Sequence, residues 1–236
     1  MPRFQGVVFD LDDTLYLERD YVRSGFRYVA GEVARVCDLP EEAAFSFLWN
    51  QFTGGLRGNN FDRLLEQNES LPAGCDATKL IDLYRSHSPK IEVATPIRNL
   101  LESLRTKGCL IGIISDGAYV SQQAKVAALG LNSLVDQIIL TDAWGRTFWK
   151  PHSRSFTTLM DAWQLRPADM VYVADNPHKD FVMPRQMGWT TVRVRIEGQI
   201  HFEIEPESEL LAPEVEIRSY DKLSEFLLLN TNGTSN

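Results

Sequence analysis

The sequence predicts an α/β fold, in which a doubly wound parallel sheet carries a small all-helical cap domain. From about residue 91 onward, short apolar runs alternate with amphipathic helical patterns, as is typical of a parallel sheet with right-handed crossovers. Between about residues 17 and 90, helical patterns follow one another with no clear strand. This stretch is too long to be a simple strand-to-helix connection. We therefore expect it to be a helical insert.

These patterns divide the 236 residues into two expected domains. Residues 1–16 and 91–236 form a Rossmann-like core, and residues 17–90 form the helical cap. A chain of this length accommodates one large domain, or a core with a small second domain. Open parallel sheets bind their ligands beyond the carboxyl ends of the strands, and the cap is expected to pack over that crevice.

The first strand is expected at Gly6–Phe9, a short uncharged run that contains β-branched residues. Strands buried on both faces have continuous apolar runs of this kind. Three aspartates follow at once: Asp10, Asp12 and Asp13. Because like charges repel, at least one of these carboxyl groups has a raised pKa unless a cation compensates, and Mg²⁺ is the natural choice. The alternative is that the aspartates form a plain turn or a helix cap.

Four helical patterns follow in the insert. They cover about Glu18–Cys37, Pro40–Phe52, Phe61–Gln67 and Thr78–His87. The glycine-rich stretch Thr53–Asn60 between the second and third patterns is expected to be a flexible loop. It contains Arg57, which is either a substrate contact made when the loop closes or an exposed arginine without a role in binding.

The remaining elements alternate between helix and strand. The predicted strands are Leu110–Ile114, Gln137–Leu140, Met170–Ala174, Thr190–Val194 and Glu214–Ile217. The predicted helices are Thr95–Lys107, Tyr119–Leu129, a helix from about Pro151 to Gln164, His178–Met187 and Tyr220–Leu229. The segment from about Ile196 to Pro213 is acidic and has no periodic pattern, so we expect an exposed excursion.

Composition and charge restrict the partners of the chain. The residues are 44% hydrophobic and 24% charged, as in an ordinary globular protein. The net charge is −8 and the pI is about 5.1, which argues against nucleic acid or an anionic membrane as a partner. An acidic protein with an anionic substrate would need a local positive site or a metal.

The cysteines and the N-terminus indicate a reducing cytoplasm as the location. Cys37, Cys75 and Cys109 are scattered and form no CxxC pair, so we expect free thiols and neither a disulfide framework nor a zinc site. The first strand begins too early to leave room for a signal peptide, and no apolar run reaches the length of a membrane span.

Polar residues also follow two later strands. Ser115 and Asp116 come after the second strand, and Asp175 comes after the fourth. The turns that follow parallel strands all open on one edge of a sheet. These side chains are therefore expected to converge with Asp10 and Asp12.

At these residues the chain resembles the haloacid dehalogenase-like hydrolases. The matching motifs are, in order, Asp10–Thr14 (DLDDT), Ile113–Gly117 (IISDG), Trp149–Pro151 (WKP) and Val173–Asp180 (VADNPHKD). The resemblance spans about residues 5–194, and the helical insert is similar to the cap of the subgroup that inserts it after the first motif. One departure is Ala174, where members often carry glycine.

The resemblance implies hydrolysis through an aspartyl-phosphate. Asp10 would be the nucleophile that attacks a phosphoryl group, and water would then hydrolyse the intermediate. Asp12 would protonate the leaving alcohol and later deprotonate the attacking water. Dehalogenating members of the family lack an acid equivalent to Asp12, so its presence favours phosphate chemistry.

The resemblance also implies a Mg²⁺ ion, held by the carboxylates of Asp10 and Asp175 and by the main-chain carbonyl of Asp12. Ser115, the turn at Asp116, and Lys150 would bind the phosphate. A plain turn is the alternative for Ser115 and Asp116, and a solvated side chain for Lys150. The supporting residue Asp180 would orient Lys150 or a metal-bound water, whereas His178 is expected to be solvated or capping.

We therefore expect a Mg²⁺-dependent phosphatase that acts on a small phosphorylated metabolite, either a sugar phosphate or a nucleotide. The alternatives are a phosphomutase of the same family and, from another class, a receiver-like switch protein that stores the phosphoryl group. A catalytically idle partner protein is disfavoured because every motif residue is present. The chain would act as a monomer or a homodimer, and the cap offers a possible dimer surface.

Overall fold

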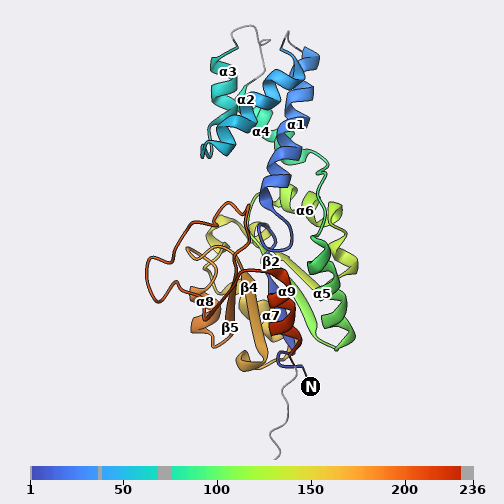
Figure 1. The fold of residues 1–236 in the computed structure, drawn as a ribbon, viewed down its shortest axis with the longest axis vertical. Helices are drawn as coiled ribbons and strands as arrows, with labels where there is room; N and C mark the ends of the chain where they lie inside the picture. Colours follow the sequence, from blue (N-terminus) through green and yellow to red (C-terminus); the bar gives the residue numbers. More distant parts are fainter. Residues whose placement is uncertain (1, 37–38, 69–75, 230–236) are drawn as a thin grey trace, which may run out of the picture. The chain divides into compact units, whose positions relative to one another are not determined.

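The computed structural model describes residues 2–36, 39–68 and 76–229 of the chain. The chain divides into two compact units, one made of residues 1–19 and 92–236 and the other of residues 20–91 (Figure 1). The role of the second unit as a cap stays a prediction.

The first unit contains a six-stranded sheet in which every pair of neighbouring strands is parallel. The strands are β1 (Gly6–Phe9), β2 (Leu110–Ser115), β3 (Gln137–Leu140), β4 (Met170–Ala174), β5 (Thr190–Val194) and β6 (Val215–Ile217). Their order across the sheet is β3-β2-β1-β4-β5-β6. This order confirms the predicted doubly wound sheet. It also explains the apolar runs, because β1 and β4 are buried along their whole length.

Helices flank the sheet. They are α5 (Thr95–Thr106), α6 (Tyr119–Ala128), α7 (Arg154–Trp163), α8 (Val182–Gln186) and α9 (Tyr220–Leu228), with short 3-10 turns at Leu131–Ser133, Thr141–Trp144, Arg146–Phe148 and Pro167–Asp169. Helices α5 and α9 lie side by side (Figure 1). One core cluster combines Val8 and Tyr172 of the sheet with Phe156 and Leu159 of α7, all of them fully buried. The Phe156 ring meets those of Tyr172 and Trp189 edge-on, at centroid distances of 5.1 and 5.6 Å.

In the described part of the second unit, every regular element is a helix, as predicted. The helices are α1 (Glu18–Val36, which starts in the first unit), α2 (Glu41–Thr53), α3 (Asn60–Glu66) and α4 (Ala77–Ser86). Phe26 of α1 lies at the centre of their core, with the rings of Phe61 and Tyr84 both 5.8 Å away. Gly25 permits this packing, because a Cβ atom there would lie 2.4 Å from the Tyr84 ring.

Two expectations for the first unit were wrong. The helix predicted at His178–Met187 begins only at Val182. The preceding residues form a turn, because the side chain of Asn176 accepts a hydrogen bond from the His178 N–H and that of Asp180 accepts one from the Asn176 N–H.

The segment after β5 is not simply an exposed excursion. Its Gln199 is buried and donates hydrogen bonds to the carbonyls of Asp13 and Val194 at 2.6 and 3.0 Å. The contact with Asp13 joins the segment to the loop that follows β1. No local pattern indicates this contact, because Asp13 is far from Gln199 in the chain.

Other expectations concern cysteines and membrane spans. Cys109 is a buried free thiol, whereas Cys37 and Cys75 lie outside the described residues. Within the ranges that the structure describes, no helix has both the length and the apolar character needed to cross a membrane.

The buried cluster around α7 leads to a stability prediction. Leu159→Ala removes a fully buried side chain and should lower the free energy of unfolding by about 2–5 kcal/mol, because the cavity that it leaves refills only partly. Urea denaturation followed by tryptophan fluorescence measures this change. Leu210→Ala makes the same substitution at a side chain that is 53% exposed and should change stability by less than about 0.5 kcal/mol. Equal effects of the two substitutions would contradict the assigned core.

Candidate active site

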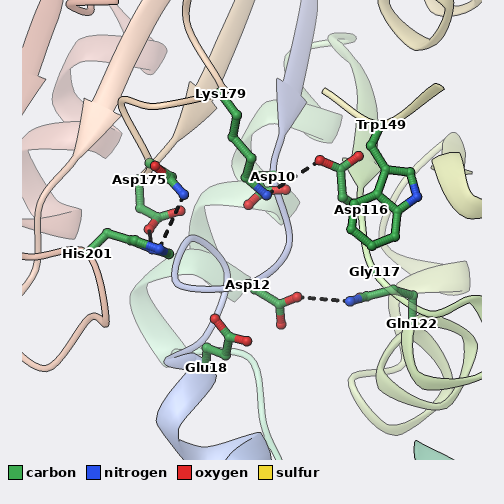
Figure 2. Close-up of a pocket in the computed structure, with 11 residues that line it drawn as sticks. Asp10, Asp12, Glu18, Asp116, Gly117, Gln122, Trp149, Asp175, Lys179 and His201 are labelled. Atoms are coloured by element: carbon green, nitrogen blue, oxygen red, sulfur yellow. Dashed lines mark hydrogen bonds and ion pairs between the residues drawn. The ribbon is translucent and has the colours of Figure 1, made fainter. Parts of the chain in front are cut away.

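The carboxyl ends of β1, β2 and β4 bring remote polar residues together around one pocket of about 170 Å³ (Figure 2). Its wall contains five carboxylates, namely Asp10, Asp12, Glu18, Asp116 and Asp175. They come from the segment after β1, the turn after β2 and the turn after β4. The shared sheet edge is therefore where acidic groups far apart in the sequence meet.

Asp10 directly follows β1 and is held by Lys150. Lys150 Nζ lies 2.5 Å from Asp10 Oδ1 and 2.8 Å from Asp180 Oδ1, and it donates to the Tyr172 hydroxyl at 3.0 Å. The Lys150 side chain is fully buried. Burial raises the pKa of Asp10 to about 7, although Lys150 opposes this shift. Any further cation beside Asp10 would favour its ionised, nucleophilic form.

Asp12 points toward α6 instead. Lys125 Nζ donates to both of its carboxylate oxygens, at 2.7 and 2.8 Å, and Gln122 Nε2 donates to Oδ2 at 3.1 Å. The Tyr16 hydroxyl also donates to this carboxylate. Burial alone would raise the pKa of Asp12, but Lys125 and these hydrogen bonds lower it. Asp12 is thus a carboxylate that accepts hydrogen bonds from the side chains of Lys125, Gln122 and Tyr16.

Ser115 is the last residue of β2, and Asp116 follows it in the turn. Ser115 Oγ donates to Gln122 Oε1 at 3.1 Å, so Gln122 links this hydroxyl to Asp12. Asp116 Oδ1 accepts from Thr141 Oγ1 at 2.6 Å and from the Lys150 N–H at 3.2 Å. A carboxylate has no proton to donate to a phosphate oxygen. A phosphate-binding role for Asp116 therefore depends on its main-chain N–H.

Asp175 follows β4 and is bound by a residue that the sequence did not indicate. His201 Nδ1 lies 3.0 Å from Asp175 Oδ2, and Asn176 Nδ2 lies 3.3 Å from the other ring nitrogen. Arg193 of β5 donates to the main-chain carbonyls of Asp175 and His201, at 2.9 Å each. Burial raises the pKa of Asp175, whereas His201 lowers it. His201 thus contacts the Asp175 side chain directly, whereas Asn176 contacts the His201 ring and Arg193 binds the main chain of both residues.

Among the residues that the structure describes, two groups of three acidic or histidine side chains have possible metal-ligand atoms within 4.8 Å of one another. The first contains Asp10, Asp175 and Asp180, all buried, and oxygen ligands of this kind fit a hard divalent cation. The second contains Asp13, Asp175 and His201. The Asp13 oxygens already accept main-chain hydrogen bonds from Glu18 and Ile200, and burial raises its pKa to about 9. The first group is thus the better candidate for a metal.

Several residues of the site were missed by the sequence reading. Gln122 and Lys125 are one helical turn apart on α6, a spacing that marks one face but is common in any helix. Lys179 lies within the fourth motif, Val173–Asp180, and this position could have indicated that it belongs to the site. His201 belongs to a segment with no pattern, so no signal pointed to it.

Arg57 lies in the second unit. Its guanidinium is 4.1 Å from the centre of the Phe52 ring and donates to the Phe52 carbonyl at 2.6 Å. A contact between Arg57 and substrate stays a prediction.

Comparison with known proteins agrees with these motifs. A family model described as haloacid dehalogenase-like hydrolase matches residues 7–194. The glyceraldehyde 3-phosphate phosphatase of Methanocaldococcus jannaschii is 28% identical over 197 residues, which cover 80% of this chain and 84% of that protein. The (S)-2-haloacid dehalogenase of Pseudomonas putida is 26% identical over 186 residues, which cover 75% and 78%.

A solved structure shares the fold. The HAD-hydrolase YfnB from Bacillus subtilis, bound to magnesium, superposes with a TM-score of 0.69 at 18% identity and covers 96% of this chain and 100% of that one. The family model matches most of this chain. The chain therefore belongs to the haloacid dehalogenase-like hydrolases.

Proposed function

We propose that the protein is a Mg²⁺-dependent phosphomonoester hydrolase that acts on a small sugar phosphate through an aspartyl-phosphate on Asp10. The observation that carries this proposal is the pair of aspartates after β1. Asp10 is a buried carboxylate beside a buried lysine, and Asp12 lies two residues on, with its own donors. The phosphatases among the relatives act, by their names, on glyceraldehyde 3-phosphate, which supports a triose phosphate or a similar ester as substrate.

In the first half-reaction, a carboxylate oxygen of Asp10 attacks phosphorus, and the bond between phosphorus and the leaving-group oxygen breaks. Asp12 donates a proton to this leaving-group oxygen, which departs as an alcohol. The negative charge of an arriving phosphate raises the pKa of the nearby Asp12 and so favours the protonated acid. In the second half, Asp12 takes a proton from water, which attacks phosphorus and releases Asp10. Lys125 stabilises Asp12 in the ionised form needed for that step.

The carboxylates of Asp10 and Asp175, with the main-chain carbonyl of Asp12, would hold the Mg²⁺ ion, and Asp180 adds a nearby charge. The bound ion would supply positive charge against the phosphoryl oxygens. Lys150 holds Asp10 in position through an ion pair, and its second ion pair, with Asp180, holds the Lys150 ammonium in place.

A haloacid dehalogenase is the second candidate, because relatives with that name match most of the chain. Both chemistries use a carboxylate nucleophile. A halide leaves without a proton, whereas an alkoxide needs one, and the chain contains a carboxyl group for that purpose at Asp12, held by three side chains. This difference favours the phosphatase.

Asp10→Asn should lower kcat by about 10⁴-fold or more, because an amide cannot form the phosphoryl-enzyme. Release of inorganic phosphate from triose phosphates measures turnover, and circular dichroism verifies the fold. Incubation of the wild type with 2-chloropropionate, followed by detection of released halide, tests the alternative dehalogenase activity. Full phosphatase activity in this variant would refute the nucleophile assignment.

Asp12→Asn should lower turnover of alkyl phosphates by about 10²- to 10⁴-fold, because the leaving alkoxide loses its proton donor. With p-nitrophenyl phosphate the first step should survive, since nitrophenolate leaves without a proton. The variant should then accumulate the phosphoryl-enzyme, which intact-mass spectrometry detects. An equal loss of the first step with both kinds of ester would contradict the acid role.

Asp175→Asn should weaken Mg²⁺ binding by at least about tenfold, as judged by isothermal titration calorimetry without substrate. EDTA should abolish turnover in the wild type, and added Mg²⁺ should restore it. Asp221→Asn, which alters an exposed carboxylate of α9, is the matched control and should bind Mg²⁺ as the wild type does. Unchanged affinity in Asp175→Asn would remove this residue from the metal site.

A further inference from the structure

We propose that the ammonium group of Lys179 binds the phosphoryl group of the substrate directly, as a cation additional to Lys150. This inference rests on the proposed phosphatase function and adds a residue to its site. It starts from how the pocket distributes its positive charge.

Three lysines serve the acidic residues of this edge, and they differ in exposure. The side chain of Lys150 is fully buried and that of Lys125 is 4% exposed. The side chain of Lys179 is 33% exposed and lines the pocket (Figure 2). Among the lysines and arginines of the described residues, Lys179 alone is part of the pocket wall. A ligand that enters the pocket therefore meets this cation.

The partners of the three lysines differ as well. Lys125 and Lys150 make ion pairs of 2.5 to 2.8 Å with Asp12, Asp10 and Asp180. Lys179 Nζ lies 3.5 Å from Asp116 Oδ2, the outer limit of a hydrogen bond. The other oxygen of Asp116 already accepts two shorter hydrogen bonds. Among the described residues, the Lys179 ammonium thus has three donors and one weak hydrogen-bond partner, whereas the other two lysines form short ion pairs.

The turn after β4 fixes the direction of Lys179. The side chains of Asn176 and Asp180 accept hydrogen bonds from main-chain N–H groups within this turn. Asp180 is fully buried and contacts Lys150, whereas the adjacent Lys179 extends toward Asp10 and Asp116 (Figure 2). The backbone therefore places an inward carboxylate and a pocket-facing ammonium at consecutive positions.

The charge of the pocket explains why an anion needs this lysine. Five carboxylates line the wall, and Asp116 lies in the turn beside Ser115. A lysine side chain is positively charged at neutral pH, and the Lys179 ammonium lies 3.5 Å from Asp116 in this acidic pocket. A phosphoryl group with several anionic oxygens is a stronger acceptor than one oxygen at 3.5 Å. Lys179 would offset the repulsion that the Asp116 carboxylate exerts on the phosphoryl group.

The test measures binding of inorganic phosphate to the full chain by isothermal titration calorimetry in the presence of Mg²⁺. Lys179→Met should weaken phosphate binding by about 10- to 100-fold, and Lys179→Arg should recover part of the affinity. Lys222→Met removes an exposed lysine of α9, whose partner is Glu225, and should bind phosphate like the wild type. Equal melting temperatures verify that the variants fold.

A purely structural role, in which Lys179 only neutralises Asp116, predicts a different result. Adding Asp116→Asn to Lys179→Met would then restore wild-type phosphate affinity, whereas loss of a direct contact leaves the double variant weak. Full restoration, or affinity of Lys179→Met within twofold of the wild type, overturns the proposal. Absence of phosphate binding by the wild type overturns it also. A wild type that binds phosphate but hydrolyses no phosphomonoester refutes the proposed function alone.

Discussion

The site depends on one buried ion triad, in which Lys150 joins Asp10 to Asp180. Two carboxylates and an ammonium leave water together, and each ion costs several kcal/mol to desolvate. The arrangement is stable only because the Lys150 ammonium contacts both carboxylates and the Tyr172 hydroxyl at hydrogen-bonding distance. Loss of the lysine would leave two like charges uncompensated in the interior. The position of Asp10 is thus determined by electrostatics as much as by the end of β1.

The same requirement recurs around the pocket, with a different element supplying the partner of each carboxylate. Lys125 comes from α6 and serves Asp12, whereas Lys150 comes from the segment before α7. His201 comes from the segment after β5 and contacts Asp175. Acidic groups that would repel one another are separated in this way into local pairs. Within the described residues, the pocket wall then retains carboxylate oxygens of the kind that a divalent cation prefers, together with the accessible ammonium of Lys179.

The surroundings of Asp12 separate two chemistries that share one scaffold. Displacement of a halide and displacement of an alkoxide both begin with attack by a carboxylate. Only the second needs a proton, and only there is a second carboxyl group useful. The structure surrounds Asp12 with Lys125, Gln122 and Tyr16, and Gln122 also binds Ser115. Asp12 and Ser115 are therefore connected through the amide group of Gln122.

The sequence by itself determined the sheet, its strands and the convergence of Asp10, Asp12, Ser115 and Asp175, because apolar periodicity and the rule for parallel strand ends are local or topological properties. The late start of α8 escaped prediction, since side chains of Asn176 and Asp180 compete for the main-chain N–H groups there. Partner choice also lay beyond the sequence. That Lys125 binds Asp12, and that His201 from a patternless segment reaches Asp175, follows from packing between remote elements. Such pairings depend on distances in space, which only the tertiary structure decides.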